Sequence, residues 1–474
     1  MTFLKWCKLL GIQVNNINHN YKMTTDKQAK EIRFITSFSN TIYDVLISKG
    51  WKDVNESSDS QITNPINQIH FQKPSPTAPS DNTWDIAWCD RDNIFELFDG
   101  NQLLRNQKIN HFRNSRELCR KDLLIKNLKR RQKQLEKERN IEEWRSFHFF
   151  PLTFCLPKEY SLFVEEFKKC NSRLWIMKPV GSAQGKGIFL FSKLSEISHW
   201  KQSPLDNHHQ YHRTNSGIHN LKQNNKEKES NKKLSSQSHQ QTTAESYVVQ
   251  KYIDNPFLIG GKKFDIRIFA LVTSYSPLTV WLYRSGFARF SNAQYSNDLS
   301  DLTNSTIHLT NVSIQKKNMD NNESGKWELR KLKLHMMCTI DNGREKIDEL
   351  FHEMEMIVCR SLQSVEHIMI QDRRCFELYG YDIMIDESLK PWLIEVNASP
   401  SLSGSNEEDY HMKFNMLNDV LNIVSDEGIT VKDPLRCGGF DLIYKGVYLP
   451  MNSMSKRSNT HSGWKTYLGS CIQK

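Results

Sequence analysis

The residues best suited to chemistry are three oxygen-bearing side chains in the C-terminal half of the sequence, Asp382, Glu395 and Asn397. They belong to two apolar runs, 381–385 and 392–396, which a short turn joins in the pattern of a β-hairpin. A symmetric hairpin places Asp382 opposite Glu395, and side-chain alternation puts Asn397 on the face of Glu395. Opposed carboxylates repel unless a cation lies between them, so the pattern predicts a site for Mg²⁺, which binds a few protein oxygens together with nucleotide phosphates.

The alternative interpretation is an exposed hairpin face that carries two unrelated acids. Both carboxylates, however, stand among large apolar residues, where an unpaired charge is costly. A bound cation is therefore the stronger hypothesis.

A second group of residues is a glycine-rich loop between two apolar runs, 174–177 and 188–191. The loop follows Lys178, reads GSAQGKG from Gly181, and carries a second lysine at Lys186. Such a hairpin can cradle phosphates, although a plain turn would look the same. The loop is no Walker A motif, which has four residues between its glycines and a Ser or Thr after its lysine. The chain also lacks the H-R-D and D-F-G motifs of protein kinases.

Charged and apolar residues alternate in the segment between these two groups. Lys263, Asp265 and Arg267 occupy one face of an expected strand, and aromatic and aliphatic residues occupy the other. Arg284 and Arg289 follow near an expected turn. Together these residues predict a sheet surface with several cations that faces the hairpin, which suits a polyphosphate and carboxylates.

A sizeable folded core is needed to position these groups, and the composition allows one. The chain has 474 residues, of which 38% are hydrophobic and 25% charged, which predicts a globular protein and excludes a mini-protein or a disordered chain. No stretch reaches the length of a membrane span, and the start of the sequence lacks the pattern of a signal peptide. The ten cysteines are scattered without a C-x-x-C pair, so we expect no disulfide framework, no structural zinc site and a reducing compartment.

The net charge of +10 points to an anionic partner. Within 113–139, eleven Lys and Arg stand against four Asp and Glu. Leucines recur there at roughly helical intervals, which predicts one basic helix; they are Leu118, Leu124, Leu128 and Leu135. Two interpretations stay open, a surface that binds an acidic partner and a solvated charged face.

The composition also predicts how the chain is divided. The stretch 202–244 is polar and low in complexity, so we expect a disordered insertion within a loop of one domain. The expected segments are an N-terminal extension 1–30, an N-terminal α/β domain 31–110, a central domain 111–200 with the basic helix and the glycine-rich loop, the insertion 201–245, a C-terminal lobe 246–440 and a tail 441–474.

These motifs resemble the tubulin–tyrosine-ligase-like family, whose members have an ATP-grasp fold. The matching sequences occur in the family's order over 32–423, apart from the insertion; they are WIMKPVGSAQGKGIFLF, QKYIDNPFLIGGKKFDIRIF, GFARF, HLTNVSIQK, GKW, and FELYGYDIMID with PWLIEVNASPSL. HFRN, LFVEEF, WLYRSGFARFSN and GGFDL are most similar to family members regarded as tubulin polyglutamylases. One departure concerns the grip on the acceptor chain, because Ser182 and Ala183 stand where many relatives have a basic residue.

The resemblance implies an α/β (α+β) protein, an ATP-grasp fold with antiparallel sheets around the nucleotide site, preceded by a smaller N-terminal α/β domain. It implies ATP and Mg²⁺ as cofactors, with Asp382, Glu395 and Asn397 as metal ligands. Arg289 and Lys326 match positions that hold incoming glutamate. Lys178, Lys186 and Arg267 would be the catalytic cations. The residues implied to bind ATP are Lys178, Gln184, Gly185, Lys186, Gly187, Gln250, Lys251, Tyr252, Ile253, Lys263, Phe264, Asp265, Thr310 and Asn311.

The activity implied by the resemblance is ATP-dependent ligation of glutamate to glutamate side chains in the acidic tails of tubulin, through an acyl phosphate. Ligation of glycine or tyrosine would share the ATP residues and stays open, as does a non-catalytic microtubule-binding scaffold. The implied partners are tubulin tails, microtubules and free glutamate, with a partner subunit left open; neither a nucleic acid nor a membrane is expected. The implied location is the cytoplasm and cytoskeleton, including the axoneme and basal body of a cilium or flagellum.

Overall fold

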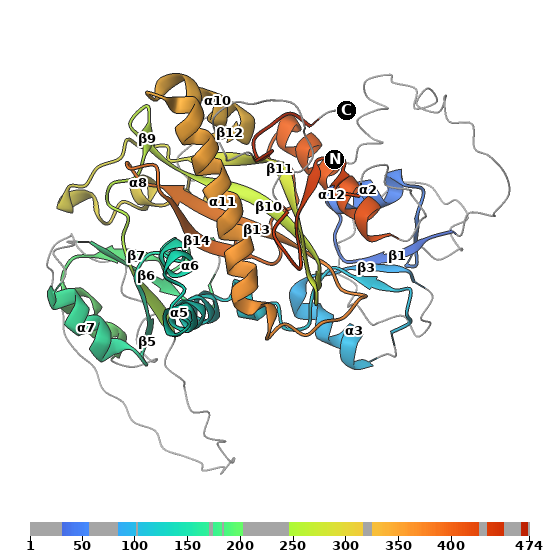
Figure 1. The fold of residues 1–474 in the computed structure, drawn as a ribbon, viewed down its shortest axis with the longest axis horizontal. Coiled ribbons are helices and arrows are strands. Elements are labelled where there is room, and N and C mark those ends of the chain that lie inside the picture. The colour runs from blue at the N-terminus through green and yellow to red at the C-terminus, as the bar shows by residue number, and fades with distance from the viewer. Residues whose placement is uncertain are drawn as a thin grey trace, which may run out of the picture.

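The fold is built around a large antiparallel sheet that two smaller sheets accompany (Figure 1). The computed structural model describes residues 31–55, 84–100, 103–169, 174–182, 184–201, 246–315, 325–425, 434–449 and 466–472. Within these ranges the mixed α/β architecture with antiparallel sheets agrees with the expected fold class. The segments predicted as an N-terminal extension, 1–30, and most of the insertion, 202–245, lie outside the described residues.

The central sheet has the strand order β14-β13-β10-β11-β16-β15, and β9 and β12 pair with β10 and β11. Its strands are β9 (Leu258–Ile259), β10 (Lys262–Tyr275), β11 (Leu278–Phe290), β12 (Lys326–Glu328), β13 (Glu377–Ile385), β14 (Pro391–Asn397), β15 (Arg436–Cys437) and β16 (Phe440–Lys445). Neighbouring strands are antiparallel throughout. Nearly all side chains of β10 and β13 are buried, because both faces of these two strands are covered by other parts of the protein.

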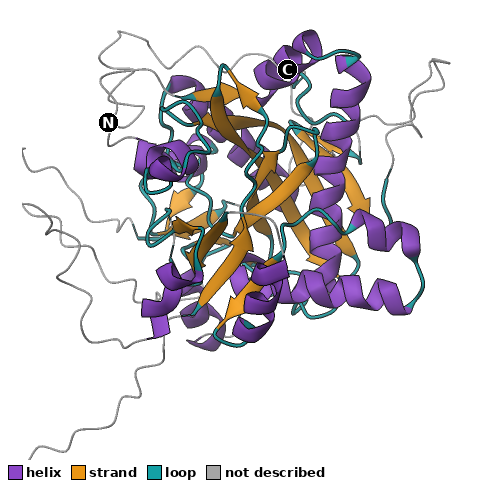
Figure 2. Ribbon diagram, turned by 90° about the vertical axis from the view of Figure 1, so that its left-hand side faces the viewer, coloured by secondary structure: helices purple, strands orange, loops and turns teal. Residues whose placement is uncertain are grey.

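Helices cover both faces of the central sheet (Figures 1 and 2). On one face, α11 (Gly343–Glu366) packs through Met354 and Val358 into the core that contains Ile266 and Ile268. On the other face, α2 (Thr41–Ser48) and α12 (Glu407–Val424) pack into a core with Phe269 and Leu271. The other helices and turns are η2 (Arg91–Asn93), α3 (Ile94–Gly100), η3 (Leu194–Lys201), η4 (Leu299–Asp301), α8 (Ser305–His308), α9 (Val312–Gln315) and α10 (Leu329–Thr339). None of the helices in the described ranges is long and apolar enough to cross a bilayer.

The N-terminal residues form the expected smaller α/β unit. Its parallel sheet has the order β2-β1-β3-β4; the strands are β1 (Arg33–Thr36), β2 (Lys52–Asp53), β3 (Ile86–Trp88) and β4 (Lys108–Ile109). Phe34, Ile42 and Leu46 of this unit share one core with Phe269 of the central sheet. The unit is therefore packed onto the central sheet through common apolar residues.

The glycine-rich loop belongs to a third, antiparallel sheet with the order β5-β8-β6-β7. Its strands are β5 (Thr153–Leu156), β6 (Trp175–Pro179), β7 (Phe189–Phe191) and β8 (Tyr247–Lys251). The rings of Phe154, Phe163 and Trp175 pack beneath it, with Phe163 on α7 (Tyr160–Lys169). Because β7 and β8 share this sheet, the chain returns to the same domain after 202–245.

The basic segment forms two helices and not the single helix that was predicted. α4 (Arg116–Cys119) ends before Arg120, whose extended backbone (φ −80°, ψ 124°) breaks the helical path, and α5 (Lys121–Lys137) starts after it. A short helix, α6 (Ile141–Ser146), follows. All four leucines of the pattern are buried in the main core, so the apolar periodicity was interpreted correctly.

Two further predictions of local structure are wrong. No turn interrupts the chain near Arg284 and Arg289, because β11 runs continuously through both. Gly286 permits this path, since a Cβ there would lie 2.3 Å from the carbonyl oxygen of Arg267 on β10. The predicted tail from 441 also includes most of β16 and a buried residue, Leu468, whose side chain is 1% exposed in the main core.

Replacing Leu468 by Ala is expected to lower the free energy of unfolding by about 2–4 kcal/mol, because it leaves a cavity in a packed core. Denaturant titration of the full chain would measure the loss. Val447→Ala is a matched control, since Val447 is 64% exposed and its truncation should change stability by less than about 0.5 kcal/mol. Equal stability of both variants would show that the C-terminal segment does not contribute to the core.

Candidate nucleotide and amino-acid site

A cavity between the third sheet and the central sheet gathers most of the residues that were predicted to bind ATP. It brings residues of β6, β8, β10, β13 and β14 together with the segment 308–311. The predicted metal ligands Asp382 and Glu395 line the same cavity. The predicted ATP residues in its wall are Lys178, Gln184, Gly185, Gln250, Lys251, Tyr252, Ile253, Lys263, Asp265, Thr310 and Asn311.

Three predicted ATP residues do not line this cavity. Phe264 packs in the main core, with its ring centroid 5.2 Å from that of Phe290, because alternation along β10 turns Lys263 and Asp265 toward the cavity and Phe264 away from it. Lys186 and Gly187 lie on the exposed side of the glycine-rich loop.

Two buried lysines give the cavity its electrostatic character. The Nζ atom of Lys178 donates to Gln250 Oε1 at 2.7 Å, and that of Lys263 donates to the Tyr252 hydroxyl at 2.7 Å and to the His308 carbonyl at 2.9 Å. Burial lowers the pKa of Lys178 to about 8 and that of Lys263 to about 7. Neither ammonium forms an ion pair within the described part of the chain, so an anionic ligand such as a polyphosphate fits the cavity.

The glycine-rich loop closes over one side of this cavity. Gln184 and Gly185 both have positive φ, at 60° and 76°. A Cβ on Gly185 would lie 2.6 Å from Ile314 Cδ1 and 3.2 Å from Asn311 Oδ1, so a larger residue would not fit there. The hydroxyl of Ser313 donates to the Gln184 carbonyl at 3.0 Å. Glycine at 185 therefore allows the loop to approach the start of α9 closely.

The hairpin of β13 and β14 brings the predicted residues opposite one another, but it is not symmetric as expected, because the register shifts between Asp382 and Ile383. Asp382 pairs with Glu395, and Asn397 pairs with Gly380. The Nδ2 atom of Asn397 donates to Glu395 Oε1 and to the Gly380 carbonyl, each at 3.4 Å, which leaves Asn397 Oδ1 to accept from or coordinate a ligand. Two carboxylates and an amide oxygen thus lie on one face of the hairpin, a donor set that suits Mg²⁺.

Asp382 is already surrounded by cations. Its carboxylate accepts from Arg267 Nε at 2.5 Å and Nη2 at 3.0 Å, and it lies 2.9 Å from Arg289 Nη2. Burial opposes ionisation of Asp382, but the two guanidiniums outweigh it and hold the pKa of this carboxyl far below its ordinary value. In the described ranges no three His, Cys, Asp or Glu side chains gather as a metal site, so a cation here would need ligands from phosphate or water in addition.

The two residues predicted to hold an amino acid lie side by side on the strands β11 and β12. Arg289 pairs in register with Lys326, and Arg289 Nε donates to Asp265 Oδ1 at 2.7 Å. Lys326 Nζ lies 3.1 Å from Asp409 Oδ2 and 2.9 Å from Ser405 Oγ. Burial lowers the pKa of Lys326, and the nearby guanidiniums add to this effect, while Asp409 opposes it. These cations adjoin the nucleotide cavity, because Arg289 contacts two acids that line it.

Sequence reasoning missed several residues of the site. Lys121, at the start of α5, lines the cavity, and its Nζ lies 3.6 Å from Glu395 Oε2. The Nδ1 atom of His308 forms a hydrogen bond of 3.0 Å with the Tyr252 hydroxyl, and the carboxylate of Asp409 accepts a hydrogen bond from the ammonium of Lys326. His308 begins the motif that contains Thr310 and Asn311, so this motif could have identified it. Lys121 and Asp409 are brought to the site only by the order of the strands and helices in space, and no local sequence pattern identifies them.

Comparisons with known proteins agree with this geometry. Residues 99–431 match the pattern of the family described as the tubulin-tyrosine ligase family. The chain is 42% identical over 444 residues to a Bos taurus protein named probable tubulin polyglutamylase TTLL9, with 90% of this chain and 88% of that protein covered. It is 40% identical over 424 residues to the Caenorhabditis elegans probable tubulin polyglutamylase ttll-9, with 89% and 86% covered.

A third relative comes from Tetrahymena thermophila, the probable alpha-tubulin polyglutamylase Ttll1. It is 39% identical over 411 residues, with 81% of this chain and 92% of the relative covered. The match to the family extends over most of the chain and includes the strands and loops that line the cavity. The chain therefore belongs to the tubulin-tyrosine ligase family.

Proposed function

We propose that this chain is an ATP-dependent ligase that adds glutamate to glutamate side chains of tubulin. The observation that carries the proposal is the cavity between the third sheet and the central sheet. In it, the buried Lys178 and Lys263, which have no ion-pair partners among the described residues, face the hairpin of Asp382 and Glu395. The names of its relatives, probable tubulin polyglutamylases in three organisms, supply the expected substrate.

ATP would lie in this cavity with its phosphates near Lys178, Lys263 and the glycine-rich loop. These ammoniums offset phosphate charge in a site of low polarity, where each contact is worth more than in water. Ile176, Met384 and Ile394 supply apolar wall suited to the base. Asp382, Glu395 and Asn397 would hold Mg²⁺, which when bound neutralises charge on the phosphates.

The reaction forms an amide bond at the expense of ATP. The acceptor carboxylate attacks the γ-phosphorus, ADP leaves, and the amine of free glutamate then displaces phosphate from the acyl phosphate and loses a proton. No enzyme nucleophile takes part, so the protein contributes by positioning the reactants and stabilising charge. Arg267 is suited to stabilise charge next to the metal ligands, because its guanidinium is fixed on Asp382.

The pair Arg289 and Lys326 supports glutamate as the incoming amino acid. Glutamate brings two carboxylates, and a largely buried site must offer a cation to each. Glycine brings one carboxylate and tyrosine brings a ring that needs apolar walls. The non-catalytic scaffold is the weaker alternative, because the candidate metal ligands Asp382, Glu395 and Asn397 are all present and lie on one hairpin. We place the chain on the cytoskeleton, with tubulin tails, microtubules and free glutamate as its partners and the cilium as the expected organelle.

Replacing Lys326 by Ala is expected to raise the KM for glutamate at least roughly tenfold, because a charge-assisted hydrogen bond is worth about 1.5–3 kcal/mol. The KM for ATP should hardly change. Steady-state ligation of labelled glutamate to microtubules would measure both constants. Lys331→Ala is the matched control, since Lys331 is an exposed lysine on the neighbouring helix α10.

The same assay, run with glutamate, glycine and tyrosine in turn, tests the substrate. Wild-type protein should prefer glutamate. A better rate with glycine or tyrosine would contradict glutamate ligation and leave the ATP-dependent ligase intact, whereas no ATP-dependent incorporation of any amino acid would contradict both.

A further inference from the structure

The carboxylate of Asp409, in the first turn of α12, holds two lysine side chains together. Its Oδ2 atom lies 3.1 Å from the Nζ atom of Lys326 and 3.1 Å from that of Lys413. The backbone amide and the hydroxyl of Ser405 also donate to Oδ2, at 2.8 Å and 2.9 Å. Four donors therefore converge on one oxygen, while Oδ1 is buried and accepts no hydrogen bond within the described residues.

The cluster formed by Asp409, Lys326 and Lys413 is largely shielded from water. The exposed fractions of these three side chains are 5%, 14% and 3%. The ring centroid of Phe287 lies 4.5 Å from Nζ of Lys326 and 5.9 Å from that of Lys413. A buried ammonium is costly unless an opposite charge lies beside it. The carboxylate of Asp409 supplies that charge to both lysines.

The protonation of Lys326 depends on this carboxylate. Burial lowers the pKa of Lys326 and that of Lys413, and Asp409 opposes the effect on both. The guanidiniums of Arg289 and Arg267 lower the pKa of Lys326 further. In the described part of the chain, Asp409 is the one acid with an oxygen within 4.0 Å of Lys326 Nζ. Without its charge, the protonated form of Lys326 would be less stable.

The start of α12 keeps Asp409 in one position. The side chain of Asn406 caps the helix, and its Oδ1 atom accepts from the Asp409 amide at 2.9 Å. The preceding loop lies close to the helix, because a Cβ on Gly404 would be 2.6 Å from Cβ of Tyr410. This approach brings Ser405 to the Asp409 carboxylate. Asp409 is thus fixed by the helix cap and by the loop before it.

The cluster adjoins the proposed site of amino-acid ligation. Lys326 pairs in register with Arg289, which contacts Asp265 and Asp382. Both of these acids line the nucleotide cavity and are engaged by guanidiniums, so neither replaces Asp409 as the partner of Lys326. Two ammoniums share the carboxylate of Asp409, which leaves one positive charge for a carboxylate of the substrate.

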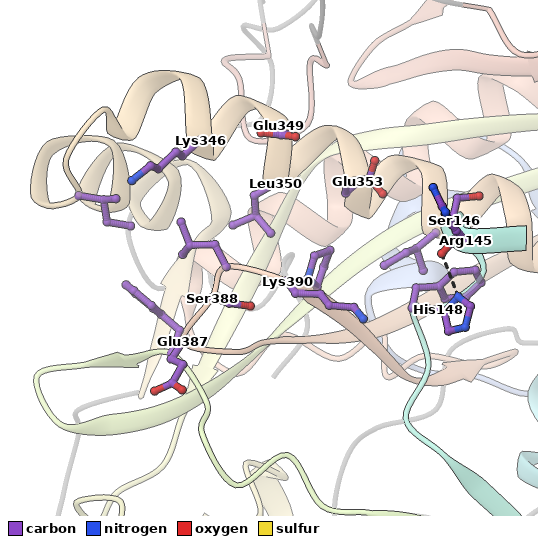
Figure 3. A pocket seen from close by; sticks show the side chains of 16 residues that line it. Arg145, Ser146, His148, Lys346, Glu349, Leu350, Glu353, Glu387, Ser388 and Lys390 are labelled. Atoms are coloured by element: carbon purple, nitrogen blue, oxygen red, sulfur yellow. Dashed lines mark hydrogen bonds between the residues drawn. The ribbon is translucent and has the colours of Figure 1, made fainter. Parts of the chain in front are cut away.

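A second place where lysines could meet an amino acid is the groove between α6, α11 and the turn of the β13–β14 hairpin (Figure 3). Its cationic and acidic side chains are equal in number and mostly exposed; they are Arg145, Lys346, Lys390, Glu349, Glu353 and Glu387. Among the described residues, none lines both this groove and the nucleotide cavity. An amino acid in the groove would not lie beside ATP, so the cluster around Asp409 is the better location.

We propose that Asp409 is a positioning residue for the incoming amino acid, because it holds the ammonium of Lys326 where a carboxylate of glutamate can bind. The inference deepens the proposed function and rests on it. Asp409 acts through Lys326 and does not itself contact the substrate, since its Oδ2 atom is occupied by donors from the protein. Its loss should therefore change the affinity for glutamate and leave the nucleotide site unchanged.

The test is the KM for glutamate of Asp409→Asn, measured by ligation of labelled glutamate to microtubules over a range of pH. The variant keeps the shape of the side chain but removes its charge, so Lys326 should lose its proton at a lower pH than in wild-type protein. At about pH 8 we expect a KM for glutamate at least tenfold above that of wild type, and this ratio should fall as the pH is lowered. The KM for ATP should hardly change.

The matched control is Glu408→Gln, which removes a neighbouring acid that is exposed on the same turn of α12. Its KM for glutamate should equal that of wild type at every pH. Ser405→Ala provides a second measurement if Asp409→Asn does not fold, because it removes a donor to Asp409 and an acceptor of Lys326. We expect it to raise the KM for glutamate by about twofold to fivefold.

Three outcomes would overturn the inference. They are an unchanged KM for glutamate in folded Asp409→Asn, a rise of the same size at every pH, and, where Asp409→Asn is unfolded, an unchanged KM in Ser405→Ala. The second outcome would show that Asp409 has a structural role without an effect on the charge of Lys326.

The charge of Lys326 can also be followed without turnover. Competitive acetylation by acetic anhydride, read by mass spectrometry, reports the pH at which each lysine becomes reactive. Asp409→Asn should lower this pH at Lys326 but not at Lys331, an exposed lysine in the same sample. If the pH shifts and wild-type protein ligates no amino acid, the hold of Asp409 on Lys326 is confirmed and the proposed function fails. If wild-type protein ligates glutamate and Asp409→Asn keeps its KM, the function stands and the inference fails.

Discussion

Replacement of Glu395 by Gln is expected to abolish glutamate ligation while the fold stays intact. Gln keeps the volume and the hydrogen bond from Asn397 but removes a carboxylate that faces both Asp382 and the cavity. Because Asp382 is already paired with two arginines, Glu395 is the carboxylate of the hairpin with more charge to offer a cation. We expect a fall in kcat of roughly a hundredfold or more, measured with saturating ATP and Mg²⁺.

The control for this variant is Glu387→Gln, which makes the same chemical change at the exposed turn of the same hairpin. Its turnover should match that of wild-type protein. Circular dichroism and thermal unfolding would show whether Glu395→Gln is folded. Near-normal ligation by a folded Glu395→Gln variant would remove Glu395 from the proposed metal site.

Replacement of Lys178 by Met is expected to weaken ATP binding by roughly tenfold to a hundredfold and to lower turnover further. Met preserves the length of the side chain, so packing changes little, but the ammonium that donates to Gln250 is lost. Isothermal titration calorimetry with a non-hydrolysable ATP analogue would measure the affinity. Lys193→Met is the control, because Lys193 is exposed just after β7. Unchanged affinity in Lys178→Met would contradict its assignment to the phosphates.

The same lysines predict a pH dependence of ATP binding. The pKa of Lys178 is lowered to about 8 and that of Lys263 to about 7, in each case chiefly by burial. A polyphosphate binds the protonated forms, so affinity should fall as pH rises through these values, and binding near pH 8 should take up protons. Calorimetry in buffers of different ionisation enthalpy would detect this uptake, which Lys178→Met should reduce. Binding without proton uptake would show that these lysines do not contact the anion.

Local patterns allowed much of the site to be predicted. The apolar runs around Asp382 and Glu395 indicated two strands joined by a short turn, and these two residues are opposite one another as predicted. A register shift between Asp382 and Ile383, which a symmetric hairpin does not predict, lies between the turn and this pair. The alternation of Lys263, Phe264 and Asp265 likewise predicted which side chains share a face of β10. These features depend on side-chain period and turn length, which near neighbours in the sequence control.

Other features depend on how distant elements meet. The sequence pattern around Arg120 favours a continuous helix, but the chain breaks there, and only the packed structure brings Lys121 to Glu395. The burial of Leu468 in the main core and the approach of β10 to Gly286 are likewise decided by packing between remote segments.

The amino-acid sequence by itself therefore determined the strands, the glycine-rich hairpin, the opposed carboxylates and the family of this protein. The tertiary structure decided that Asp382 is held by two arginines, that Lys129 of α5 is paired with Glu159 and that Lys121 lies beside Glu395. The physical reason is that hydrogen-bond register and side-chain alternation act over a few residues. The partner of a charge, in contrast, depends on which strands and helices the common core brings together.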